Sequence, residues 1–327
     1  MDFGNGKKYD VVALGELLID FTEYGPSNRG HMTFEANPGG APCNVLALLQ
    51  KLGKKTAFIG KVGDDQFGRM LCKTIGTLGI DTTNLVFDKT IPTTLAFVGK
   101  NEDGDREFSF YRNPGADMML KSDEIDIDLP TSTKIFHFGT LSMTHEAVRD
   151  ATLYAIKHAK ENGALISLDP NLREPLWESL DAAKEQMMSA LSYCDILKIS
   201  DNEIEFLTGE SDFDEGVRKI RQKNDIALIC VTLGKNGSIA YYGDRKIVAD
   251  AYVQKNVIET TGAGDTFCGC VLNYICENGL DNLTDAQIAQ MLDYANAAAS
   301  IITTRVGALN SMPEKSEIED LIGSKTE

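Results

Sequence analysis

The chain has 327 residues, of which 43% are apolar and 25% charged, and its 49 acidic and 32 basic side chains give a formal net charge of −17. This composition is globular and excludes a disordered or collagen-like chain, and the acidic balance argues against nucleic acid and anionic membranes as partners. The sequence has no run of about 18 apolar residues and no signal-peptide pattern. Its seven cysteines are scattered, so we expect a cytoplasmic protein with reduced thiols.

Short apolar runs alternate with longer amphipathic segments along the chain. The runs show no polar alternation, which is typical of strands that are covered on both faces in a parallel sheet. We predict strands at 11–14, 57–59, 135–138, 165–168, 196–199 and 228–231, and helices at 44–52, 67–78, 146–161, 182–191 and 203–207. A capping box that begins at Thr284 predicts a further helix over 286–304. This order favours an α/β fold with right-handed crossovers.

One region departs from this pattern. Two alternating runs, 93–100 and 106–111, flank a turn sequence at 101–105, which predicts a β-hairpin. Together with 21–34 they would form a small antiparallel flap, whose apolar face must cover a ligand or a second subunit. We therefore predict a single domain over 1–327 with a lid formed by roughly 20–36 and 92–113, and a homodimer through this lid.

A glycine-rich turn at 259–267 is the most informative segment. Gly262, Ala263 and Gly264 follow a β-branched run and precede a helical segment, so their N–H groups would converge at a helix N-terminus that binds anionic oxygens. Asp265 would lie in the first turn of this helix. There it could take a proton from an attacking hydroxyl, as phosphoryl transfer requires; the alternative is an acid that only caps the helix. Phe267 replaces the last glycine of a dinucleotide fingerprint, which disfavours a dehydrogenase.

A second glycine motif, NPGGAPCNV at 37–45, opens a helix and is followed by FIGKVGDDQFG at 58–68. Together with ETTGAGDTF at 259–267, these segments resemble the two signatures of the ribokinase-like, PfkB-type carbohydrate kinases, and the match runs in order from Gly15 to Pro313. The segments at 110–118, 167–173, 200–209 and 307–313 resemble the fructokinase branch. The resemblance implies a three-layer α/β/α domain with a mainly parallel central sheet and a small antiparallel β lid. It also implies an ATP:D-fructose 6-phosphotransferase.

The resemblance assigns residues to both sides of the transferred phosphoryl group. Asp265 would be the base that deprotonates the sugar hydroxyl. The anion hole would be formed by Gly262, Ala263 and Gly264, and Arg173 would lie near the phosphoryl group, which suits its fixed fork of donors. The sugar would be bound by Asp20, Gly39, Gly40, Asn44 and, from the lid, Arg112. Taken one at a time, such arginines and first-turn polar residues are more often solvated surface groups.

The same resemblance implies where the nucleotide and the cations would bind. ATP would lie along a glycine-bounded loop and a late helix, against Thr232, Gly234, Gly237 and Asn296. Glu203 would hold Mg²⁺ through water, because Mg²⁺ keeps several waters and takes few carboxylates. Glu259 stands where the family usually has aspartate, a residue tied to a monovalent-cation site for K⁺ in several members. The extra methylene of Glu259 shifts this carboxylate, which argues against K⁺ activation.

Three other functions are compatible with parts of the sequence. Another sugar or nucleoside kinase of the same family, such as a 2-keto-3-deoxygluconate kinase or a ribokinase-like enzyme, would share the fold and Asp265. A non-catalytic sugar-binding regulator would not need an acid beside a phosphate site. A dehydrogenase would need a dinucleotide fingerprint after the first strand, and residues 12–18 do not contain one.

Overall fold

A nine-stranded sheet runs through the centre of the part of the chain that the computed structural model describes, residues 6–100 and 106–325. The strand order is β13-β12-β11-β10-β9-β8-β1-β4-β5. All neighbours from β5 to β11 are parallel, whereas β12 and β13 run antiparallel to theirs. The strands are β1 (Tyr9–Leu14), β4 (Thr56–Gly63), β5 (Asp81–Asp88), β8 (Thr133–Gly139), β9 (Leu165–Asp169), β10 (Ile196–Ser200), β11 (Leu228–Thr232), β12 (Ser238–Tyr242) and β13 (Arg245–Ala249).

All six predicted strands are confirmed, while β5, β12 and β13 were not predicted. These three strands lie at or next to the two edges of the sheet. In β5 and β13 half-exposed and exposed positions interrupt the apolar run. A continuous apolar run marks a strand only where both of its faces are covered, so edge strands lack that signal.

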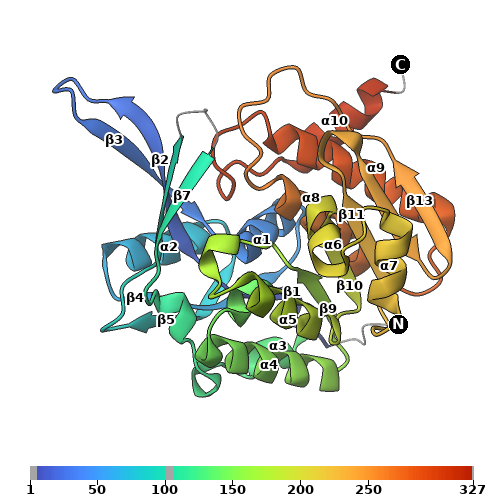
Figure 1. The fold of residues 1–327 in the computed structure, drawn as a ribbon, viewed down its shortest axis with the longest axis horizontal. Coiled ribbons are helices and arrows are strands. Elements are labelled where there is room, and N and C mark those ends of the chain that lie inside the picture. The colour runs from blue at the N-terminus through green and yellow to red at the C-terminus, as the bar shows by residue number, and fades with distance from the viewer. Residues whose placement is uncertain (1–5, 101–105, 326–327) are drawn as a thin grey trace.

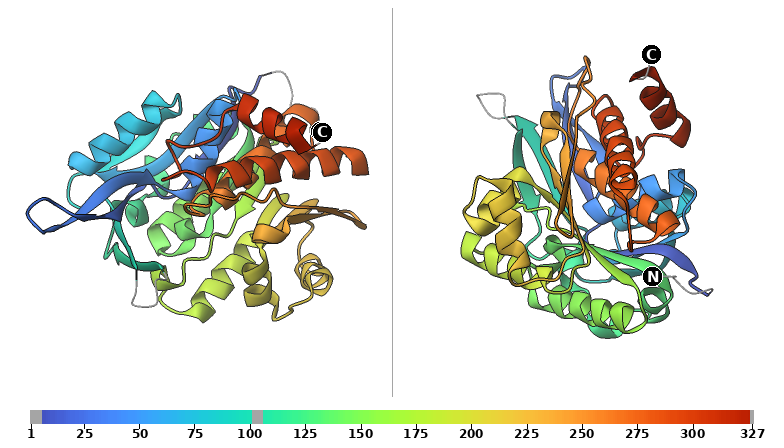
Figure 2. Two further views of the ribbon diagram at one scale, coloured as in Figure 1. Left: turned by 90° about the horizontal axis from the view of Figure 1, so that it is seen from above. Right: turned by 90° about the vertical axis from the view of Figure 1, so that its right-hand side faces the viewer.

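Helices cover both faces of the sheet, and Figure 2 shows the sheet between two helical layers. One layer contains α1 (Ala41–Lys51), α2 (Gln66–Thr77), α8 (Ala263–Asn278), α9 (Asp285–Ile302) and α10 (Lys315–Lys325). The other contains α3 (Asp128–Thr131), α4 (Glu146–Glu161), α5 (Leu180–Leu191), α6 (Asp201–Thr208) and α7 (Phe213–Arg221). Each layer packs on the sheet through its own buried apolar cluster, which confirms the three-layer α/β/α prediction. The predicted capping box is present at the start of α9, between Thr284 and Gln287.

A second, smaller sheet projects from one end of the main sheet (Figure 1). Its strand order is β3 (Met32–Gly39), β2 (Leu18–Pro26), β6 (Leu95–Lys100) and β7 (Arg106–Tyr111). The predicted hairpin strands are confirmed as the antiparallel pair β6–β7, while its turn at 101–105 lies outside the described residues. The sheet was predicted to be antiparallel, and this is wrong for one pair: β2 and β6 are parallel. The chain leaves β2 through β3, α1, β4, α2 and β5 before it returns, and this long crossover permits a parallel pairing.

The two faces of the small sheet differ in chemistry. Strand alternation and register place Phe21, Phe34, Phe97 and Tyr111 on one face, where their rings form contacts with centroids 4.8–5.4 Å apart. Asp20 points to the opposite face. The face that carries Asp20 and the aromatic face can therefore contact two different kinds of group.

Two further findings bear on the sequence-based expectations. All seven cysteines are free thiols, and six of them are buried. Within the described ranges, none of the helices combines the length and the apolarity that a membrane crossing needs.

Candidate functional site

The start of α8 forms the floor of the site. Gly262 is the N-cap residue with φ 79°, a left-handed conformation that glycine adopts without strain. A Cβ at this position would lie 2.7 Å from Ala308 Cβ, so the loop at 307–313 packs directly on the turn. Because the N-cap residue is a glycine, no side chain at that position accepts a hydrogen bond from the first N–H groups of α8. Asp265 lies in the first turn, as predicted, and it is buried.

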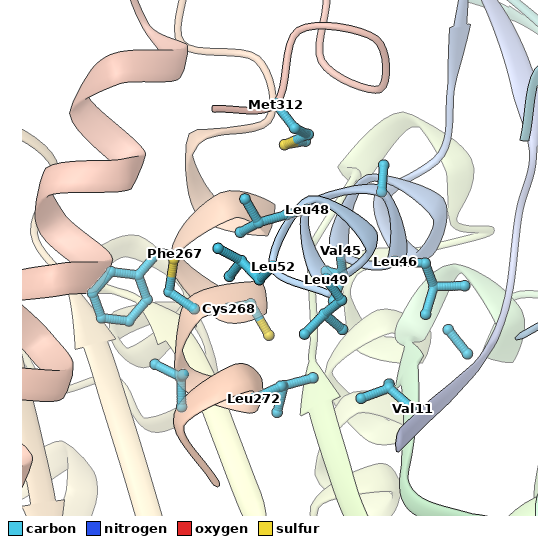
Figure 3. Close-up of a cluster of buried hydrophobic side chains, with 14 of the residues drawn as sticks. Val11, Val45, Leu46, Leu48, Leu49, Leu52, Phe267, Cys268, Leu272 and Met312 are labelled. Atoms are coloured by element: carbon cyan, nitrogen blue, oxygen red, sulfur yellow. The ribbon is translucent and has the colours of Figure 1, made fainter. Parts of the chain in front are cut away.

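Asn44 of α1 binds the Asp265 carboxylate. Its Nδ2 donates to Asp265 Oδ2 over 2.8 Å, across 221 residues of sequence. The two helices are held together by apolar side chains such as Leu48 and Leu52 of α1 and Cys268 of α8, which lie between them in Figure 3. Asn44 Oδ1 is buried and has no hydrogen-bond partner among the described residues. Because a buried amide oxygen normally has a donor, this atom marks a place for a ligand hydroxyl.

The charges around Asp265 have opposing effects on its pKa. Burial raises the pKa, because it disfavours the ionised form. The hydrogen bond from Asn44 and the positive charges of Lys198 and Arg173 act in the other direction. The carboxylate is therefore a base with a raised pKa, as general base catalysis favours.

Asp20, which the sequence predicts to bind sugar, lies over the glycine turn that precedes α1. Its Oδ2 occupies the space where a Cβ of Gly39 would be. Burial raises the pKa of Asp20 to about 6; the charge of Arg173 lowers it and that of Glu259 raises it. Arg173 thus acts on both Asp20 and Asp265, although the loop after β9 leaves it exposed and it donates only to Leu172 O within the described residues.

A carboxylate that the sequence interpretation missed holds the other part of this turn. Glu16 Oε1 accepts from the N–H of Ala41, the first residue of α1, over 2.8 Å. Gly40 has φ 132°, and a Cβ there would collide with the carbonyl oxygen of Glu16. Burial raises the pKa of Glu16 to about 7. Glu16 therefore fixes the glycine turn to the loop between β1 and β2.

A cavity of about 390 Å³ opens beside the start of α8. Six predicted residues line it: Thr232, Gly234, Gly237, Ala263, Gly264 and Asn296. Its wall also contains Phe267 and Ser300, and Asn296 Nδ2 donates to the carbonyls of residues 249 and 250, which fixes the rim. The size lies in the range of small-molecule sites. The four predicted nucleotide residues and two of the three predicted anion-hole residues therefore line one cavity at the carboxyl edge of the sheet.

Glu203 links two loops at this edge. Its Oε2 accepts from the N–H and the hydroxyl of Ser200, and its Oε1 accepts from Leu172 N, each over 2.8 Å. Burial would raise the pKa of Glu203, but the Lys198 charge and these hydrogen bonds lower it overall. The ionised carboxylate keeps lone pairs for bound water, so its chemistry fits an outer ligand of Mg²⁺. Within residues 6–100 and 106–325, the structure contains no group of three or more His, Cys, Asp or Glu side chains that could hold a metal directly.

The structure places two of the predicted residues in protein contacts. Arg112 is buried, and its guanidinium donates to Asp117 over 2.8 Å, to Thr144 Oγ1 over 3.0 Å and to Leu141 O over 3.2 Å. Glu259 Oε1 accepts from Gly307 N over 2.8 Å and so fixes the loop that covers Gly262. The predicted roles of these two residues toward sugar and K⁺ stay predictions.

Comparison with known proteins decides the family. The sequence model of the pfkB family carbohydrate kinases matches residues 8–315. The chain belongs to this family. It is 43% identical to "Probable fructokinase-2" of Arabidopsis thaliana over 309 residues, which cover 94% of each chain.

Solved structures of fructokinases resemble this carbohydrate kinase closely. The fructokinase from Xylella fastidiosa with bound ATP has a TM-score of 0.89 at 28% identity, with 97% of this chain and 99% of that chain covered. A double mutant of the fructokinase from Vibrio cholerae O395, in its fructose, ADP and potassium ion bound form, has a TM-score of 0.86 at 29% identity, with 98% and 100% covered.

Besides Glu16, two charged residues of this carbohydrate kinase do not stand out in the sequence interpretation. Asp169 ends β9, and Lys198 lies within β10; both are buried, and Lys198 Nζ is 3.0 Å from Asp169 Oδ2. A lysine inside a five-residue apolar strand is itself a signal, because a buried charge needs a partner. The sequence gives no indication which acid that partner is.

Proposed function

We propose that the chain is an ATP-dependent fructokinase that transfers the γ-phosphoryl group of ATP to the 6-hydroxyl of D-fructose. The observation that carries this proposal is the contact between Asn44 and Asp265 at the open N-terminus of α8, beside the nucleotide-sized cavity. The choice of fructose is supported by the fructokinase names of the relatives and by the fructose that one of them binds.

In the proposed reaction, Asp265 takes the proton of the 6-hydroxyl as the hydroxyl oxygen attacks the γ-phosphorus. The bond between this phosphorus and the β,γ-bridging oxygen breaks, and ADP leaves. The Asn44 hydrogen bond holds the carboxylate, and its unpartnered Oδ1 accepts from a sugar hydroxyl. Asp20, next to Gly39, accepts from other hydroxyls. Arg173 supplies a positive charge to the transferring phosphoryl group, while the N–H groups of 262–264 stabilise the charge that develops on its oxygens.

ATP binds in the cavity with its phosphates toward Gly264. Mg²⁺, when bound, neutralises phosphate charge and keeps the β- and γ-phosphates in position. Glu203 holds its water from the protein side. Glu259 supports K⁺ binding indirectly, since it fixes the 307–313 loop against Gly262.

The small sheet acts as a lid over the sugar. Asp20 lies on the face that looks toward the site, so closure would exclude water and suppress hydrolysis of ATP. The network around Arg112 and Asp117 anchors the end of β7 to the body, and this gives Arg112 a supporting role in sugar binding.

The aromatic face of the lid supports a homodimer. Tyr111 is 65% exposed, Met32 52% and Phe34 42% in the isolated chain, and a second copy would cover them. Sedimentation at micromolar concentration tests this proposal: we expect a dimer, and Tyr111→Glu should weaken it. The buried free thiols support a cytoplasmic location.

A coupled assay with purified protein tests the proposed function. ATP and Mg²⁺ are supplied with fructose, ribose, adenosine or 2-keto-3-deoxygluconate, each with and without K⁺. We expect fructose to give the highest kcat/KM. A preference for another acceptor would replace fructokinase by that kinase of the family, and binding of sugar without any turnover would indicate a regulator.

A further inference from the structure

Lys198 is a buried cation on the face of the main sheet that α8 covers. It lies in the middle of β10 and is 7% exposed. Ile196, two residues earlier, belongs to the apolar cluster under α8, whereas Leu197 and Ile199 belong to the cluster on the other face. Alternation therefore directs the Lys198 side chain toward α8.

Its ammonium group lies between the end of β9 and the first turn of α8. Nζ is 3.0 Å from Asp169 Oδ2 and 3.2 Å from Asp169 Oδ1. A Cβ at Gly264 would lie 3.0 Å from the same Nζ. The ion pair is thus in van der Waals range of the backbone that forms the anion hole.

The groups around Lys198 keep it charged. Burial disfavours the ammonium ion, but the carboxylates of Asp169, Glu203 and Asp265 raise the pKa of Lys198 overall. On β8, two strands away from β10, burial and the Lys198 charge lower the pKa of His137 to about 3, so this imidazole is neutral. Lys198 is therefore the positive charge buried within a group of three carboxylates.

Stability alone does not account for this ion pair. A buried ion pair is often replaced by apolar residues of similar volume with no loss of stability, because removing two charges from water is costly. Here the cation has a second use. The three carboxylates lie around Lys198 behind the turn whose Ala263 and Gly264 line the cavity. Without Lys198, their charge would oppose a triphosphate bound in that cavity.

We propose that Lys198 is a positioning residue for phosphoryl transfer, which holds a positive charge behind Gly264 and thereby supports the anion hole at the start of α8. The inference deepens the proposed function and rests on it. Lys198 contacts Asp169 and the α8 turn, and we assign it no contact with the sugar.

Three variants separate this role from a structural one. Asp169→Asn keeps the cation and removes its partner. Lys198→Met combined with Asp169→Asn removes both charges of the ion pair, while Glu203 and Asp265 keep their own hydrogen bonds. The double variant should therefore fold even if Lys198→Met alone does not. Lys61→Met is the matched control. Lys61 is also a buried strand lysine, paired with Asp88 over 3.1 Å and Glu124 over 2.7 Å, but it lies in β4, four strands away from β10.

The measurements are kcat and KM for fructose in the coupled assay, with thermal unfolding to confirm folding. We expect the double variant to have a kcat about 10- to 100-fold below that of Asp169→Asn, with KM for fructose within about threefold. We expect Lys61→Met to lower the unfolding temperature and leave kcat within about twofold of wild type. Equal kcat values for the double variant and Asp169→Asn would overturn the proposal, as would a kcat loss in Lys61→Met equal to that of the double variant. A wild-type protein without kinase activity would instead contradict the proposed function.

Discussion

The N-termini of α1 and α8 are alike in local structure, but they differ in which group accepts hydrogen bonds from their first N–H groups. Each helix follows a glycine with positive φ, Gly40 or Gly262, and neither N-cap residue provides a side chain. At α1 the buried carboxylate of Glu16 accepts from the first N–H of the helix. The start of α8 instead borders the nucleotide cavity. A helix N-terminus attracts an acceptor oxygen in either case, and it becomes a substrate site only where the chain does not supply that oxygen itself.

Removal of the base at α8 should have the largest effect. We expect Asp265→Asn to lower kcat about 10²- to 10⁴-fold, because general base catalysis contributes that much, while the Kd for fructose changes only severalfold. The coupled assay and isothermal titration measure the two quantities. Asp285→Asn is the control, since Asp285 is also a first-turn acid, at α9, but is exposed. Wild-type turnover in Asp265→Asn would reduce Asp265 to a capping residue.

Alanine substitution of the two N-cap glycines should have different effects at the two helices. In Gly262→Ala the Cβ meets Ala308 and the φ of 79° is strained, so the anion hole is displaced and we expect kcat to fall about 10- to 100-fold. In Gly40→Ala the Cβ meets the Glu16 carbonyl, and we expect a loss of about 1–3 kcal/mol in the free energy of unfolding with a smaller loss of kcat. Urea unfolding and steady-state kinetics compare the pair. Equal effects on kcat would show that the two N-termini do not differ as argued.

Sequence reasoning identified the start of α8 better than the start of α1. The turn at 262–264 and Asp265 are contiguous, so one motif describes the base and its anion hole. At α1 the partners come from different parts of the chain: Glu16 is 25 residues from Ala41, and Asn44 is 221 residues from Asp265. A single sequence does not show which residues so far apart along the chain lie close together in the folded protein. The same limit explains why the Lys198–Asp169 pair and the parallel β2–β6 pairing were missed, whereas the continuous apolar strands at the centre of the sheet were found.

The amide of Asn44 connects the two helices, and its removal should have an intermediate effect. In Asn44→Ala a hydrogen bond to the Asp265 carboxylate is lost, so the pKa of Asp265 rises and the acid limb of kcat/KM moves to higher pH. KM for fructose should rise about tenfold, as expected for one lost hydrogen bond to a ligand. A pH profile of wild type and variant measures both. An unchanged acid limb would mean that Asn44 does not act on the base.

The smallest expected effect concerns stability at α1. The pKa of Glu16 is raised from 4.5 to about 7 by burial, so the folded protein binds this proton more tightly than the unfolded chain. The contribution of Glu16 to the free energy of unfolding should therefore be highest at low pH and fall as pH rises from 4.5 to 7, by at most about 3 kcal/mol. Glu16→Gln cannot lose a proton and should flatten that decline, while Asp20 and Asp169, each with a pKa raised to about 6, retain part of it.

Urea unfolding between pH 5 and pH 8 measures this difference (roughly the range over which the three acids titrate). Glu146→Gln changes an exposed first-turn acid of α4 and should keep the wild-type slope. If Glu16→Gln also kept that slope, the Glu16 carboxyl would be ionised in the folded protein throughout this range. It would then meet the N-terminus of α1 as a full negative charge, which at α8 only the phosphates of the nucleotide provide.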